Sequence, residues 1–141
     1  MLNEIRDGKK LTKNKIVVGT LNDSCIEFLK NRKITIHTKE IYLTSKGLSH
    51  LARDSKKKRG AGLSDEDILK IPSILTSPSD IYFDQGKKRF NLIYCDLNRK
   101  KCIKIAVDTK AFSNKKETIT MIKTAGYIKK EDMNDVIFER I

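Results

Sequence analysis

Only two histidines occur among the 141 residues of this sequence. His50 is the one that falls on a polar helical face, so it is the side chain best suited to proton transfer. A helix starting near residue 46 would carry four polar side chains on one face, which are Lys46, His50, Arg53 and Lys57. Neighbouring cations favour the neutral form of imidazole, which accepts a proton near pH 7. This stripe therefore combines a candidate general base with a candidate phosphate-binding surface.

Cations and hydroxyls elsewhere in the chain could supply the other groups that RNA cleavage without a metal requires. The run Lys56-Lys57-Lys58-Arg59 follows the helix, and it can hold phosphate oxygens and the charge that develops in the transition state. A strand expected over 118–124 places Thr118, Thr120 and Thr124 on one face, as a row of hydroxyl donors.

Each of these groups also has an ordinary structural explanation. His50 can be one more solvent-facing polar residue, and the run 56–59 can be a solvated patch or a phosphate tether. Threonine is a good strand former on any exposed face. The cluster Asp65-Glu66-Asp67 resembles a metal site only in composition, because acidic residues are expected in the first turn of a helix. We expect no metal and no other cofactor.

The chain carries 30 Lys and Arg against 18 Asp and Glu, which gives a net charge of +12 and a pI near 9.7. Residues 1–60 hold fifteen basic and six acidic side chains, so most of the surplus lies in the first half. This balance favours a polyanionic partner, with nucleic acid as the leading candidate. The sequence has no run of 18 apolar residues and no apolar stretch after Met1, so we expect a cytoplasmic protein without membrane contact.

The three cysteines do not combine with the two histidines at the spacing of a zinc site. We expect free thiols, as is usual in a reducing cytosol. Cys95 and Cys102 flank an expected turn, however, and they are the one pair that can face each other across a hairpin.

The elements that must position these groups are short. Helices are expected over 22–31, 46–57 and 64–72, the last one limited by Pro72. Antiparallel strands are expected over 81–83, 89–95, 103–107 and 118–124, after shorter β-prone runs at 16–20, 34–36 and 41–43. A short helix or a final strand is expected after residue 128. We assign 1–15 to a basic N-terminal arm and 16–141 to a single domain.

The order of these segments resembles the phage-type members of the barnase–EndoU–colicin–RelE-like nuclease superfamily. The likeness rests on Ile41-Tyr42-Leu43-Thr44-Ser45, on Leu48-Ser49-His50, on the run from Leu63 to Pro78, and on the hairpins that lead to Ile119-Thr120-Met121. It covers residues 34–124, and it lies in a shared layout with a few polar residues more than in any fixed string.

The resemblance implies an α+β fold in which N-terminal helices pack on a four-stranded antiparallel sheet. It also implies a metal-independent endoribonuclease, toxin-like or phage-encoded, with a cognate inhibitor protein as a partner besides RNA. His50 matches the family's histidine, Arg59 or Lys57 its downstream cation, and Thr120 its last-strand threonine. Several relatives carry an aromatic residue two positions after that threonine, where this chain has Ile122. This departure leaves open an altered substrate, reduced activity or RNA binding alone.

We therefore expect cleavage of single-stranded RNA or a tRNA loop by attack of the 2′-hydroxyl, which leaves a 2′,3′-cyclic phosphate. The expected catalytic residues are His50, Arg59, Lys57 and Thr120. The residues expected to bind nucleic acid around them are Lys46, Arg53, Lys56, Lys58, Thr118, Lys123 and Thr124. Two other functions stay open: a basic RNA- or DNA-binding module without catalysis, and a phage structural or accessory protein whose charge only meets packaged nucleic acid.

Overall fold

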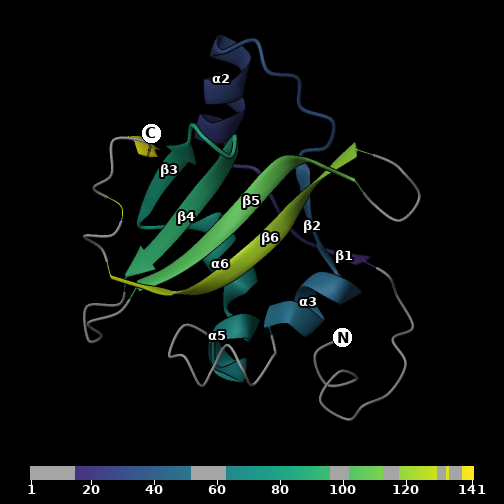
Figure 1. Ribbon diagram of the computed structural model, residues 1–141, viewed down its shortest axis with the longest axis vertical. Coiled ribbons are helices and arrows are strands. Elements are labelled where there is room, and N and C mark those ends of the chain that lie inside the picture. The colour runs from purple at the N-terminus through teal and green to yellow at the C-terminus, as the bar shows by residue number, and fades with distance from the viewer. Residues whose placement is uncertain (1–14, 52–62, 96–101, 113–117, 130–132, 134–137) are drawn as a thin grey trace.

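The computed structural model describes residues 15–51, 63–95, 102–112, 118–129, 133 and 138–141, which form a strand-rich fold (Figure 1). Its elements in chain order are β1 (Lys15–Thr20), α2 (Asp23–Asn31), β2 (Glu40–Thr44), α3 (Ser45–Leu51), α5 (Asp65–Leu69), α6 (Ile71–Thr76), β3 (Asp80–Asp84), β4 (Arg89–Cys95), β5 (Cys102–Phe112), β6 (Thr118–Ile128) and β7 (Phe138–Arg140). The expected basic arm lies outside the described residues, apart from Lys15, which opens β1.

The seven described strands form one sheet in the order β1-β2-β6-β5-β4-β3-β7. The neighbouring strands are antiparallel, except that β2 and β6 run parallel. The strands β3 to β6 follow one another along the chain and form the centre of the sheet. The pair β1–β2 joins this centre at one side, and β7 joins it at the other.

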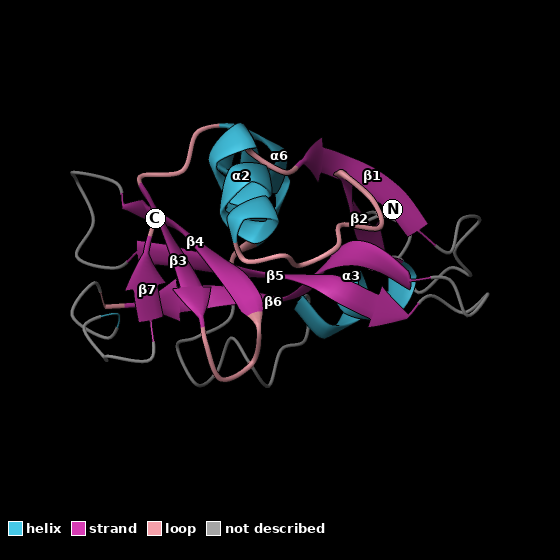
Figure 2. Cartoon of the chain, turned by 90° about the horizontal axis from the view of Figure 1, so that it is seen from above, coloured by secondary structure: helices cyan, strands magenta, loops and turns pink. Residues whose placement is uncertain are grey.

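One face of the sheet packs against helices. Figure 2 shows α2 and α6 lying over this face. Alternation along β4 and β5 sends Phe90 and Leu92 toward the helices together with their cross-strand partners Val107 and Ile105. All four side chains are almost fully buried, so the expected alternation of apolar residues in these two strands sets the main core.

A bulge in the β5–β6 pair interrupts the expected alternation of β6. Val107 pairs with Ile122, but the adjacent pair is Ala106 with Thr124, which leaves Lys123 as an extra residue on β6. Because side chains alternate between the two faces of a sheet, the extra residue reverses the face of every later position. Ile122 and Thr124 therefore point to opposite faces although they are two residues apart.

Local side-chain signals set the starts of two helices. The Ser64 hydroxyl oxygen accepts a hydrogen bond from the Asp67 N–H at 3.2 Å, so Ser64 caps α5 as the sequence predicts. Thr44 Oγ1 accepts from the Gly47 N–H at 2.9 Å and caps α3 in the same way. Pro72 lies in the first turn of α6, where its missing N–H costs nothing.

The expected fold class is wrong. The sheet has seven strands and is mixed, and the helices are few and short, so N-terminal helices do not pack on a four-stranded antiparallel sheet. The four strands that were expected form only the centre of the sheet. The β-prone runs expected at 16–20 and 41–43 form β1 and β2, and β7 is the final strand. These strands join the centre through backbone hydrogen bonds, which leave little trace in the side-chain pattern. Residues 34–36, expected as a strand, are not in one, and residues 52–57 of the expected helix lie outside the described part.

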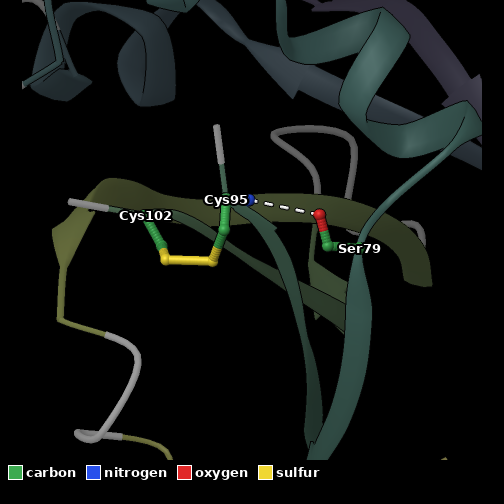
Figure 3. The surroundings of a disulfide bond; sticks show 3 residues. All are labelled: Ser79, Cys95 and Cys102. Carbon is green, nitrogen blue, oxygen red and sulfur yellow. Dashed lines mark hydrogen bonds between the residues drawn. A yellow bond between two sulfur atoms is a disulfide. The ribbon is translucent and has the colours of Figure 1, made fainter. Parts of the chain in front are cut away.

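Cys95 and Cys102 form a disulfide across the ends of β4 and β5 (Figure 3). The two residues are direct partners in the antiparallel register, and their Cα atoms lie 4.4 Å apart, which is close enough for a cross-strand bridge. Ser79 Oγ accepts a hydrogen bond from the Cys95 N–H at 3.2 Å. The expectation of three free thiols is therefore wrong, and the hairpin alternative holds.

Cys25 keeps a free thiol, which lies buried in α2. Burial raises the pKa of this thiol to about 12, and a hydrogen bond with Ser24 lowers it only in part. At neutral pH the group is a protonated, apolar core residue. A buried thiol that stays protonated is a weak nucleophile.

Candidate nucleic-acid interface

The helix that carries His50 lies against the strand that carries the expected threonines. β2 pairs with β6 in parallel, with Ile41 opposite Thr120, and α3 begins directly after β2. Gly47 of α3 comes so close to β6 that a Cβ atom there would lie 3.8 Å from the Ile122 carbonyl oxygen. The structure thus brings together the two elements from which the expected site was drawn.

The expected cations near this helix are only partly described. Lys46 is exposed at the start of α3. The backbone of His50 belongs to α3, but its side chain lies outside the described part of the structure. The expected basic residues between α3 and α5 lie wholly outside the described part; they are Arg53, Lys56, Lys57, Lys58 and Arg59. Their roles in binding or catalysis stay predictions.

Thr120 does not present its hydroxyl to solvent. Its side chain is fully buried, and its Oγ1 donates a hydrogen bond to the Thr38 carbonyl oxygen at 2.7 Å. The Thr120 N–H in turn donates to Thr38 Oγ1 at 2.9 Å. The hydroxyl proton is therefore used to hold the segment before β2 onto β6. The interpretation of Thr120 as an exposed donor is wrong, and we do not retain it as a phosphate ligand.

The expected row of hydroxyls does not exist as one surface. Thr118 is partly exposed and faces the same side as Thr120. The bulge at Lys123 sends Thr124 to the opposite face, where it pairs with Ala106. Lys123 itself is exposed. A period of two could not reveal this change, because one inserted residue is invisible in the sequence pattern.

We expect Thr120→Val to weaken the fold, because it removes the buried hydroxyl that donates to the part-buried Thr38 carbonyl oxygen. Leaving such an acceptor without its partner costs about 2 kcal/mol. Thr118→Val is the matched control, since that threonine is partly exposed on the same strand, and its change should stay within about 0.5 kcal/mol. Urea unfolding of both variants measures the difference; equal stability would show that the hydrogen bond from Thr120 Oγ1 to the Thr38 carbonyl oxygen contributes nothing.

A polar cluster that sequence reasoning missed ties α5 to β6. Asp67 is buried, and its carboxylate accepts a hydrogen bond from the Tyr127 hydroxyl. Lys70 Nζ lies 3.6 Å from the other carboxylate oxygen of Asp67 and 3.7 Å from Glu66. The sequence pattern correctly placed Asp67 in the first turn of a helix. The pairing with Tyr127, 60 residues away, has no local signal.

A pocket of about 430 Å³ opens beside this cluster, between α6 and the end of β4. Its lining residues are Lys70, Ser73, Ile74, Thr76, Ser77 and Tyr94. None of these residues belongs to the expected site. Hydroxyl residues in a short helix and a tyrosine at a strand end are common in structural roles, so their types alone did not indicate a site.

The charge of the chain is concentrated outside the described segments. The 98 described residues hold 15 Lys or Arg and 10 Asp or Glu, whereas the other 43 hold 15 and 8. The run 52–62 alone contributes five cations and one acid. In the described part of the chain, no three His, Cys, Asp or Glu side chains gather as possible ligands of one metal ion. The helices in this same part are too short to cross a membrane.

No family model matches this chain, and neither a curated protein nor a solved structure matches it.

Proposed function

We propose that this protein binds RNA as a polyanion, through a surface formed by α3 and the basic segment that follows it. The observation that carries the proposal is the concentration of charge in residues 52–62, with five cations and one acid, inside a chain of net charge +12. Lysine and arginine contacts to phosphates supply most of the affinity of such proteins, and this affinity is largely independent of sequence.

The described residues on either side of this basic segment belong to the main core. Leu51 ends α3 and Leu63 precedes α5, and both side chains are almost fully buried in the main core. The residues that flank the segment, Leu51 and Leu63, therefore lie in the same core. Lys46 of α3 and Lys123 of β6 add exposed cations from the two neighbouring elements. RNA is preferred over DNA because the residues around His50 resemble those of metal-independent ribonucleases.

A cytoplasmic location is part of this proposal, since RNA is abundant there. The Cys95–Cys102 disulfide is an observation against this location. Disulfides are rare in a reducing cytosol, where they exchange with their dithiol form.

The test is the salt dependence of RNA binding by a triple variant, Lys56→Gln, Lys57→Gln and Lys58→Gln. We expect weaker binding and a shallower slope of log affinity against log salt, by about one unit for each phosphate that the variant no longer neutralises. Fluorescence anisotropy with a labelled single-stranded RNA, a tRNA and a single-stranded DNA of equal length measures the slope and the preference.

A control variant removes the same charge at the other end of the molecule, by Lys30→Gln, Lys87→Gln and Lys88→Gln. These lysines are exposed at the end of α2 and in the β3–β4 turn, far from α3 (Figure 1). The control should keep the wild-type slope. Equally weakened binding by both triple variants would mean that only net charge matters, and an unchanged slope in the first would place the binding surface elsewhere.

Metal-independent cleavage of RNA is a second candidate function. The specific observation that favours it is the packing of α3, which carries His50, against β6. Because Thr120 is buried, the expected catalytic set is reduced to His50 with Lys57 and Arg59. In this mechanism His50 takes the proton of the 2′-hydroxyl, the 2′-oxygen attacks phosphorus as the P–O5′ bond breaks, and the 5′-oxygen takes a proton from water and leaves as the 5′-hydroxyl.

A further inference from the structure

The pocket between α6 and β4 is lined by none of the residues proposed for phosphate binding. It has a volume of about 430 Å³, which is within the usual range for sites that hold small molecules. One wall is aromatic, from Tyr94, and another is apolar, from Ile74. The hydroxyl residues Ser73, Thr76 and Ser77 complete the lining at the carboxyl end of α6.

The local charge decides which part of an RNA this pocket can hold. Lys70 is its cation, but Lys70 Nζ lies 3.7 Å from the Glu66 carboxylate and 3.6 Å from that of Asp67. One ammonium group beside two carboxylates leaves no positive surplus for a phosphate. The pocket therefore suits a neutral, flat group with hydrogen-bonding edges.

The aromatic wall is held in place by its neighbours. Tyr94 pairs with Ile103 across the β4–β5 ladder and packs against the main core. The next residue, Cys95, is fixed by the disulfide and by the hydrogen bond of its N–H to Ser79 Oγ (Figure 3). Such a ring loses little conformational freedom when a ligand stacks on it.

The hydroxyls give this wall its edge contacts. Ser73 and Ser77 line the pocket, and Thr76 Oγ1 donates to the Pro72 carbonyl oxygen at 3.1 Å while its lone pairs can still accept. Hydroxyl groups can donate to or accept from the edge of any base. Stacking on an aromatic ring with such edge contacts is the usual way in which proteins hold unpaired bases.

We propose that this pocket receives one unpaired base of a bound RNA, stacked on Tyr94. The inference rests on the proposed RNA binding and adds to it: phosphates bind at the basic surface, whereas a base enters the pocket. It predicts that affinity depends on bases as well as on charge.

The experiment compares two labelled ligands by fluorescence anisotropy, oligouridine and an oligomer of the same length that has the ribose-phosphate backbone but no bases. Wild-type protein should bind oligouridine about tenfold more tightly, since stacking of one base on an aromatic ring has this size. Tyr94→Ala should remove this preference and keep the salt slope. Tyr94→Phe should keep the preference, because the ring remains.

Two further variants guard against a purely structural effect. Tyr42→Ala removes a partly buried tyrosine from β2, which is separated from β4 by β6 and β5 in the sheet. This variant should leave the preference unchanged. Ser73→Leu places an aliphatic side chain in the pocket from an exposed position of α6, and it should abolish the preference because it fills space without adding a ring.

The outcomes separate this inference from the proposed function. If wild-type protein binds both oligomers equally well, the base site is wrong while polyanion binding stands. If it binds neither, the proposed function fails. A preference that survives both Tyr94→Ala and Ser73→Leu would also overturn the base site.

Discussion

We expect His50→Ala to slow RNA cleavage by about 100-fold while RNA affinity stays near that of the wild type. A general base contributes a factor of this size to the rate, because it removes the 2′-hydroxyl proton as the 2′-oxygen attacks. The change should leave the free energy of unfolding within about 0.5 kcal/mol, since the sequence pattern predicts His50 on a polar helical face. Single-turnover cleavage in excess EDTA, with detection of 2′,3′-cyclic phosphate ends, measures the rate.

His37→Ala is the matched control, because His37 is exposed in the segment before β2 and is the other histidine of the chain. It should cleave at the wild-type rate. A folded His50→Ala protein that also cleaves at this rate would remove the catalytic role. Wild-type protein that binds RNA but leaves it intact would restrict the function to binding, and a strict need for added magnesium would exclude the metal-independent mechanism.

Features that depend on a few neighbouring residues could be predicted from the sequence. Ser64 and Thr44 cap helices through hydroxyls three residues from their donors. The turn after Asp84 closes through hydrogen bonds from the Gly86 and Lys87 N–H groups to the Asp84 carboxylate. The alternation of apolar residues in β4 and β5 located the centre of the sheet for the same reason, since a strand buried on one face has an apolar residue at every second position.

Features that depend on distant segments could not be predicted. The parallel pairing of β2 with β6 joins residues about 80 apart, and neither strand differs in pattern from an antiparallel one. The two hydrogen bonds between Thr38 and Thr120 are equally distant in sequence. The burial of Thr120 follows from this pairing. The type and spacing of Thr120 indicated a hydroxyl donor, but only the sheet order shows that the Thr38 carbonyl oxygen accepts its proton.

Reduction of the Cys95–Cys102 disulfide should lower the melting temperature by roughly 8 °C. The bridge closes a short loop, from residue 95 to residue 102, and a loop of this length restricts the unfolded chain by about 2.5 kcal/mol in the chain-entropy model. For a chain of this size each kcal/mol shifts the midpoint by about 3 to 4 °C. Thermal unfolding with and without dithiothreitol measures the shift.

The double variant Cys95→Ala and Cys102→Ala provides the control, because its remaining thiol, Cys25, forms no disulfide. It should melt near the temperature of the reduced wild type and should not respond to dithiothreitol. Thiol titration in denaturant gives an independent count: one thiol before reduction, from Cys25, and three after it. Three thiols before reduction in protein purified without reductant would contradict the bridge. Retention of the bridge in protein taken directly from a reducing cytosol would show that the register of β4 and β5 protects it from exchange with cellular thiols.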